Sequence, residues 1–182
     1  MHAKHRSVGM PEALTGSAEA QPIADQMAAA LPPERVRVGV EARSKKHALE
    51  LVSELLAGPE GELTASDLFC SLIQRERLGC TGLGNGVALP HGRSSAVTQP
   101  RAALVRLREA VAYDAADDVP VDLVLAVLIP ADADPGQLAM LGEAARRLMR
   151  TTDRAALRRA NDTGGLRAAM LAAEPDAGGE GA

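Results

Sequence analysis

The alternation of apolar and polar residues along this chain predicts four β-strands. Residues 35–41 alternate valine with arginine, which is typical of a strand with one buried face. Residues 121–130 are apolar apart from Asp122 and predict a central strand that is buried on both faces. Shorter apolar runs at 86–90 and 101–107 predict two further strands.

Apolar residues at helical spacing predict helices between these strands. One begins at the N-cap residue Ser44 and ends at Gly58, and a second runs from the N-cap residue Thr64 to about Arg77. A long third helix begins at the N-cap residue Asp134, and two short helices follow it. This order predicts an α/β fold, in which a mixed parallel and antiparallel sheet is sandwiched between helices in a single domain.

Arginines gather near the end of the long helix and just after it. Such a cluster is typical of a solvated face at the negative end of a helix, and a docking site for an acidic partner is the alternative. Its members are Arg146, Arg147, Arg150, Arg154, Arg158 and Arg159.

The two ends of the chain differ in composition from its middle. Residues 1–33 are rich in small, polar and basic residues and predict a flexible N-terminal arm, in which residues 21–31 could form a turn or two of helix. Residues 175–182 predict a flexible tail. The domain is therefore expected to span residues 34–174.

Composition narrows the function. Aromatic residues make up 1% of the 182 residues and the formal net charge is −4, which argues against nucleic acid as a partner. Two cysteines, Cys70 and Cys80, lack the spacing of a zinc site or of a disulfide framework and fit a reducing cytoplasm. The sequence shows no apolar run of about 18 residues and no signal-peptide core, so we expect neither membrane insertion nor export.

The most unusual chemistry lies in residues 75–93, where a glycine-rich loop leads to Pro90 and His91. A neutral histidine can act as a nucleophile or a proton carrier, although a hydrogen-bonded histidine in a glycine-rich turn is the plainer alternative. The loop matches neither the dinucleotide fingerprint nor the P-loop, because Leu89 occupies the position of the last glycine and no Lys-Ser/Thr pair follows. Its backbone N–H groups are better suited to binding an anion.

Residues 81–92, with the sequence TGLGNGVALPHG, resemble the active-site segment of enzyme IIA domains of the phosphotransferase system. The resemblance is to the fructose, mannitol and nitrogen-regulatory class, and is closest to its nitrogen-regulatory members. It extends from about Val36 to Met170 and includes residues 44–50, 75–79 and 120–131. In this family the histidine of the Pro-His-Gly step carries a phosphoryl group, and an arginine matching Arg75 lies beside it.

The resemblance implies a phosphocarrier that takes part in nitrogen regulation or sugar transport. His91 would accept a phosphoryl group from an HPr-like phosphohistidine protein, then relay it to a separate permease component or signal to regulatory targets. One ring nitrogen must be free to attack while the other donates to a fixed acceptor, such as a backbone carbonyl. Arg75 and the loop residues Gly84, Asn85 and Gly86 would bind the phosphoryl oxygens, without a metal or other cofactor.

One position departs from the family. Members commonly place a second histidine at the start of the helix after the Pro-Ala-Asp step, and this chain has Gln137 there. Gln137 either contacts the phosphoryl group or forms a capping box with Asp134, and a neutral amide would stabilise phosphohistidine less than an imidazolium does. A regulatory binding module that takes up no phosphate is the alternative function. A hydrolase is disfavoured, because the chain contains no Gly-x-Ser-x-Gly motif.

Overall fold

The computed structural model describes residues 22–59 and 63–172. Its helices are α1 (Ile23–Ala30), α2 (Lys45–Ala57), α3 (Ala65–Leu78), α4 (Pro135–Met149), α5 (Thr151–Arg159) and α6 (Thr163–Leu171), with a 3-10 turn at Pro33–Arg35. Its strands are β1 (Val36–Val40), β2 (Gly82–Gly84), β3 (Val87–Ala88), β4 (His91–Ser94), β5 (Arg101–Val111) and β6 (Val121–Pro130).

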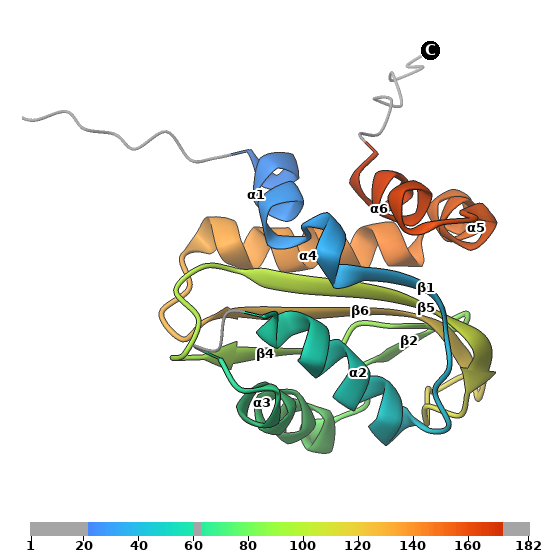
Figure 1. Cartoon of the computed structure of the whole chain (residues 1–182), viewed down its shortest axis with the longest axis horizontal. Coiled ribbons are helices and arrows are strands. Elements are labelled where there is room, and N and C mark those ends of the chain that lie inside the picture. Colours follow the sequence, from blue (N-terminus) through green and yellow to red (C-terminus); the bar gives the residue numbers. More distant parts are fainter. Residues whose placement is uncertain (1–21, 60–62, 173–182) are drawn as a thin grey trace, which may run out of the picture.

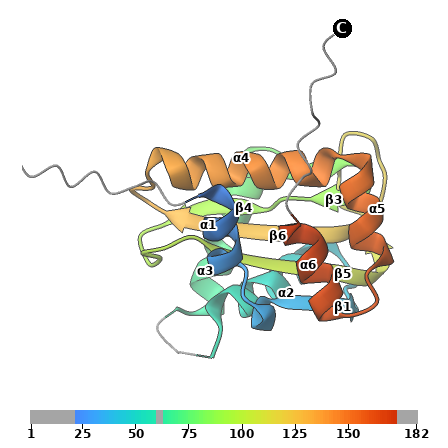
Figure 2. The same cartoon turned by 90° about the horizontal axis from the view of Figure 1, so that it is seen from above.

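The strands form one mixed sheet between two layers of helices, which confirms the predicted fold class. The sheet order is β1-β5-β6-β3-β2, and β4 follows β3 along the same side of β6. β1 is parallel to β5, β5 is antiparallel to β6, and β3 and β4 are parallel to β6. Helices α1, α4, α5 and α6 cover one face of the sheet, and α2 and α3 cover the other (Figures 1 and 2).

Two aliphatic cores lie on the two faces of the sheet. Side chains of β6 alternate between them, since Leu123 and Leu125 pack in one core while Val124 and Ala126 pack in the other. β6 is therefore buried on both faces, as its apolar run predicts. Tyr113, which is 1% exposed, is the only aromatic residue in either core.

The predicted alternation along the first strand is wrong at its end. Val36 and Val38 face the core under α1 and α4, but Val40 packs in the core under α2 and α3. The pairing with β5 shifts between Val38 and Val40, where Gly39 has a φ of +71°. Glycine adopts this left-handed conformation without a steric penalty, so the chain bulges and the next side chain changes face.

The predicted strand at 86–90 is two strands. β3 and β4 both pair with β6 but are separated by Leu89 and Pro90, and His91 is the first residue of β4 rather than the residue after a strand. Proline has no N–H to donate to the ladder, although its carbonyl accepts from Val127 N at 2.9 Å. β5 is also longer than predicted, since it continues to Val111.

Part of the predicted N-terminal arm belongs to the packed domain. Met27, Ala30 and Leu31, in and just after α1, are buried against α4 and the sheet. The predicted boundary at residue 34 is therefore wrong for residues 22–33. The rest of the arm and the tail at 175–182 lie outside the described residues.

Arginine side chains close the C-terminal ends of all six described helices. The last carbonyls of a helix lack partners and carry its negative dipole end, so a guanidinium there forms charge-assisted hydrogen bonds. The acceptors are Ala28 O and Leu31 O of α1 for Arg167, Ala57 O of α2 for Arg101, Gly79 O of α3 for Arg75, Leu148 O and Met149 O of α4 for Arg154, Arg158 O and Ala160 O of α5 for Arg106, and Met170 O and Ala172 O of α6 for Arg147.

This arrangement corrects part of the prediction of a solvated basic face, in which Arg146 and Arg159 are exposed as predicted. Arg147 and Arg154 are buried, and Arg158 is engaged with Asp122 at 2.7 Å and with the carbonyl of Asn85. The guanidinium groups of these three arginines are used within the fold.

A buried ion pair joins α2 to α3. Lys45 Nζ lies 2.6 Å from Oε1 of Glu76, whose side chain is 4% exposed. Burial alone would raise the pKa of Glu76, but hydrogen bonds from Lys45 and Thr81 outweigh it and hold that pKa below its ordinary value. Burial would lower the pKa of Lys45, but the Glu76 carboxylate holds it above its ordinary value. Both groups are therefore charged at neutral pH.

We predict that Arg147→Met lowers the free energy of unfolding by about 2 kcal/mol, because two carbonyls at the end of α6 lose a charged donor. The neighbouring Arg146→Met is the control, since the Arg146 side chain is 65% exposed against 9% for Arg147. Its effect should stay below about 1 kcal/mol. Urea unfolding measures both, and equal losses would contradict the capping role.

We predict that Glu76→Gln lowers the free energy of unfolding by about 3 kcal/mol at pH 7, because Lys45 loses its buried partner. A carboxylate with a lowered folded-state pKa stabilises the fold above its unfolded pKa of about 4.3, and this contribution is lost as the pH falls through the folded-state pKa. The difference between wild type and variant should therefore shrink as the pH falls below about 4.

Glu50→Gln is the control for this titration. The Glu50 side chain is 43% exposed, and it lies 3.4 Å from the exposed Lys46. Its removal should change the free energy of unfolding by less than about 1 kcal/mol. Urea unfolding at several pH values compares the three proteins, and a Glu76→Gln deficit that stays constant from pH 7 to pH 3 would refute the assignment.

Candidate functional site

His91 begins β4 beside Val127 of β6 and is half-buried. Its Nδ1 lies 2.8 Å from the carbonyl oxygen of Leu89. Because a carbonyl oxygen can only accept, Nδ1 carries the ring hydrogen, and Nε2 of the neutral ring keeps a lone pair. This is the arrangement that the sequence analysis requires of a nucleophilic histidine.

Helix α3 lies directly against the segment that carries His91. A Cβ atom at Gly92 would lie only 3.2 Å from Ser71 O in the middle of α3, so glycine allows this close approach. At the other end of α3, Glu76 binds Thr81, whose carbonyl accepts from Leu89 N at 3.0 Å. α3 therefore runs alongside residues 89–92, with its C-terminal end near Leu89.

Arg75 lies one helical turn after Ser71, whose backbone carbonyl oxygen lies close to Gly92 of β4. Its Nη1 donates to Gly79 O at 3.0 Å. The guanidinium therefore closes the end of α3 in this structure, and it is partly exposed. A contact between Arg75 and a phosphoryl group stays a prediction.

The loop residues Gly84, Asn85 and Gly86 form the tip of the β2–β3 hairpin. Their φ values are +86°, +55° and +77°, which suit the Asn-Gly turn of a tight hairpin. Asn85 N already donates to Asp117 Oδ2 at 2.7 Å, and Arg158 binds Asn85 O. The tip is thus held by carboxylate and guanidinium groups of the protein itself.

The hairpin tip also lies far from His91. Gly86 O accepts from the N–H groups of Asp122 and Leu123, whereas His91 pairs with Val127. Four to five residues of extended strand separate these positions, which is about 15 Å. The prediction that Gly84, Asn85 and Gly86 bind a phosphoryl group on His91 does not fit this geometry, and we leave them out of the proposed site.

Gln137 forms the capping box that the sequence left as one of two alternatives. Its side-chain oxygen accepts from Asp134 N at 3.1 Å, and its own N–H donates to the Asp134 carboxylate at 2.9 Å. The side-chain oxygen is therefore committed to the start of α4. A contact from its amide nitrogen to a phosphoryl group stays a prediction.

Sequence reasoning missed Glu76 and Thr81 beside the site. Leu68, Leu72 and Glu76 recur at intervals of four along α3 and are all buried. A carboxylate on an otherwise apolar helix stripe is unusual, because burying a charge costs free energy unless it is paired. That spacing is the signal in the sequence that could have identified Glu76.

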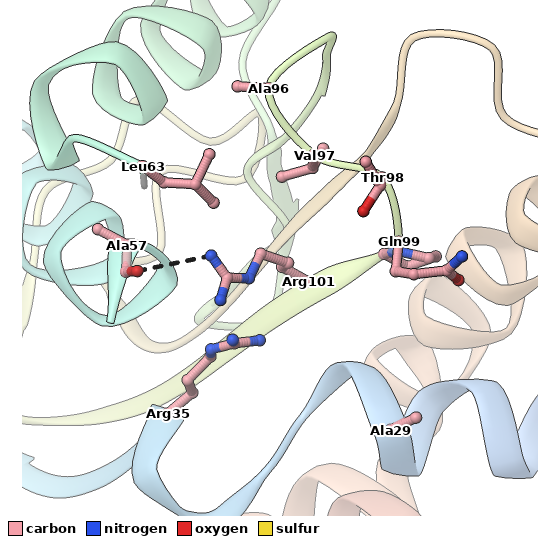
Figure 3. A pocket seen from close by; sticks show the side chains of 10 residues that line it. Ala29, Arg35, Ala57, Leu63, Ala96, Val97, Thr98, Gln99 and Arg101 are labelled. Carbon is pink, nitrogen blue, oxygen red and sulfur yellow. Dashed lines mark hydrogen bonds between the residues drawn. The ribbon is translucent and has the colours of Figure 1, made fainter. Parts of the chain in front are cut away.

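A separate cavity of about 330 Å³ lies among α1, α2 and the loop before β5 (Figure 3). Arg35 and Arg101 line it, and Arg101 donates to Ala57 O at 3.5 Å. Neither His91 nor Arg75 lines this cavity. His91 therefore lies outside this cavity.

Residues 22–59 and 63–172 contain neither a metal-binding cluster nor a membrane-spanning helix. No three His, Cys, Asp or Glu side chains gather there in a way that could hold a metal ion. No helix in the same residues is both long and apolar enough to cross a membrane.

Comparison with known proteins places this geometry in a family. The family described as phosphoenolpyruvate-dependent sugar phosphotransferase system, EIIA 2, matches residues 29–172. A nitrogen regulatory protein of Pseudomonas aeruginosa is 41% identical over 130 residues, which are 71% of this chain and 84% of that protein. The crystal structure of nitrogen regulatory protein IIA-Ntr from Neisseria meningitidis matches with a TM-score of 0.74 and 36% identity, over 79% of this chain and 98% of that one.

A more distant match shares the fold. Mannitol enzyme IIA of Escherichia coli, solved in complex with phosphorylated enzyme IIB, has a TM-score of 0.62 and 18% identity over 76% of this chain and 94% of that one. The matches to the nitrogen regulatory proteins confirm the resemblance seen in residues 81–92. The chain belongs to the EIIA 2 family of the phosphoenolpyruvate-dependent sugar phosphotransferase system and is similar to its nitrogen regulatory proteins.

Proposed function

We propose that the protein is a phosphocarrier whose His91 accepts a phosphoryl group on Nε2 from an HPr-like phosphohistidine protein. The observation that carries this proposal is the 2.8 Å hydrogen bond from Nδ1 to Leu89 O, which leaves Nε2 as the nitrogen with a lone pair. Membership of the EIIA 2 family supports it. In this role the protein is a phosphotransferase with a phosphohistidine intermediate.

The transfer exchanges one phosphorus–nitrogen bond for another. As Nε2 of His91 bonds to phosphorus, the bond to the donor histidine breaks and its electron pair stays on the donor ring. Nδ1 keeps its hydrogen, and the Leu89 carbonyl stabilises the positive charge that develops on the His91 ring. The reaction needs no metal or organic cofactor.

Arg75 is the residue that we assign to the phosphoryl oxygens. Its guanidinium has five N–H donors, and the bond to Gly79 O uses one nitrogen. A partly exposed arginine one helical turn after Ser71 can reorient toward a dianion on His91, where its bonds would be charge-assisted. In this assignment Arg75 offsets the charge of the transferring group.

The downstream step is either transfer to a separate permease component or signalling to regulatory targets. The complex of mannitol enzyme IIA with phosphorylated enzyme IIB supports a protein as acceptor, and the similarity to nitrogen regulatory proteins supports signalling. Both roles suit a histidine that lies outside the cavity lined by Arg35 and Arg101.

A second candidate function is a regulatory binding module that takes up no phosphate. The side-chain oxygen of Gln137 is committed to the capping box, and no histidine follows His91 in the sequence. A phosphoryl group on His91 would therefore lack a neighbouring imidazolium from that part of the chain. The first experiment below separates the two functions.

We predict that the wild-type protein takes up acid-labile, base-stable phosphate from a complete donor relay of phosphoenolpyruvate, enzyme I and an HPr-like protein. His91→Ala should abolish the uptake, because it removes the nucleophile. His47→Ala is the matched control and should keep wild-type uptake, since His47 lies on the first turn of α2 and its Nδ1 accepts from Arg43 N. Failure of the folded wild type to take up any phosphate would favour the binding module.

We predict that Arg75→Ala slows phosphoryl uptake by about tenfold to a hundredfold, because the transferring group loses a charged donor. The free energy of unfolding should fall by only about 1 kcal/mol, since the lost bond caps a partly exposed helix end. Arg77→Ala, in the same turn but at an exposed position, is the control for both quantities. A rate equal to that of wild type would assign Arg75 to helix capping alone.

A further inference from the structure

Three successive hydrogen bonds link a buried carboxylate to the His91 ring. Both oxygens of Glu76 lie 3.1 Å from Thr81 N, and one of them also accepts from the Thr81 hydroxyl. Thr81 O accepts from Leu89 N at 3.0 Å, and Leu89 O accepts from His91 Nδ1 at 2.8 Å. Glu76 therefore holds Thr81 in place, and Thr81 in turn holds Leu89. The carbonyl of Leu89 selects the tautomer of the His91 ring.

Neighbouring groups hold this carboxylate firmly. Lys45 Nζ lies 2.6 Å from Glu76 and 4.8 Å from the centre of the Tyr113 ring. The Tyr113 hydroxyl lies 3.4 Å from the Thr81 hydroxyl. Glu76, Thr81 and Tyr113 are all buried, so solvent does not compete for these bonds.

The strand that begins after Thr81 is also held from its other side. A Cβ atom at Gly82 would lie 2.8 Å from the Ala115 side chain, so the backbone there is pressed against residue 115. Thr81 is thus fixed through its N–H, its carbonyl and its hydroxyl, next to a backbone that has little room to move. A group held in this way can set the position of the Leu89 N–H.

Stability of the fold alone does not require a buried carboxylate on the apolar stripe of α3. The stripe positions before it are Leu68 and Leu72, and replacement of a buried ion pair by apolar side chains is often neutral or stabilising. The pair would be worth its desolvation cost if it serves a particular geometry. Here Glu76 fixes the position of the Thr81 backbone, which is two hydrogen bonds away from His91.

We infer that Glu76 and Thr81 are positioning residues for His91, which hold the Leu89 carbonyl where it selects the Nδ1–H tautomer. The effect on the reaction rests on the proposed phosphocarrier function, whereas the effect on the tautomer does not. An imidazole that loses the bond to Leu89 distributes its hydrogen over both nitrogens, and the Nε2–H form has no lone pair at Nε2 with which to attack. Loss of either residue should therefore lower the fraction of reactive His91.

The experiment measures the His91 tautomer by nitrogen-15 NMR of the full, unphosphorylated chain at about pH 8.5, where a histidine of ordinary pKa is neutral. The His91→Ala variant identifies the His91 signals. Glu76→Gln and Thr81→Val should raise the Nε2–H fraction at least about threefold, and Thr81→Ser, which keeps the hydroxyl, should restore the wild-type ratio. Phosphoryl uptake should fall about tenfold in the first two variants and recover in the third.

Asp122→Asn is the matched control for general loosening of the fold. It breaks the ion pair with Arg158 at the far end of the same hairpin, where Asp122 bonds at 2.7 Å, and leaves Glu76 and Thr81 intact. It should lower the melting temperature without a change in the tautomer ratio. Thr81→Val keeps the inference testable if Glu76→Gln does not fold.

Two outcomes would overturn the inference. One is a wild-type tautomer ratio in folded Glu76→Gln and Thr81→Val, which would leave both residues with a purely structural role. The other is an equal change in Asp122→Asn. If the wild type takes up no phosphate but its tautomer ratio still responds to Glu76 and Thr81, the positioning role stands and the phosphocarrier function fails.

Discussion

The unpaired carbonyls at helix C-termini are the constraint on which the packing of this protein depends. Each described helix receives an arginine guanidinium at that end, and five of these arginines come from another element of the fold. The cores themselves are aliphatic, and aliphatic side chains cannot bond a carbonyl. Long arginines solve this problem, because their stems pack with apolar groups while their planar heads bind carbonyls in neighbouring layers.

Charged side chains also hold the segment that leads to His91. Lys45 and Glu76 link helices α2 and α3, and Glu76 also binds Thr81, the residue just before the β2–β3 hairpin. At the other end of the hairpin, Arg158 and Asp122 hold the turn. Only Leu89 and Pro90 separate the hairpin from His91, so both ends of the hairpin are fixed by ion pairs before β4 begins. The fold therefore presents the imidazole on a rigid frame, which suits a group that must meet a partner in one orientation.

The proposed phosphoryl transfer between two proteins requires a histidine that a partner protein can reach. His91 is half-buried and lies outside the cavity between α1 and α2. Its Nδ1 is committed to the carbonyl of Leu89, so in the proposed reaction the fold, and not the partner, would select Nε2 as the reacting nitrogen. Gln137 is neutral, and its side-chain oxygen is committed to the start of α4. Arg75 is therefore the cation that we assign to the phosphoryl group.

The sequence by itself determined the features that depend on residues close together in the chain. The N-caps Ser44, Thr64 and Asp134, the buried strand β6 and the Pro-His-Gly step follow from contacts over a few positions or from an apolar run. Tertiary structure alone decided the bulge at Gly39, the break at Pro90, the packing of α1 and the separation of the hairpin tip from His91. It also decided the roles of the arginines, because their acceptors lie up to 139 residues away, and no local pattern of charge or hydrophobicity encodes which distant carbonyl a guanidinium will reach.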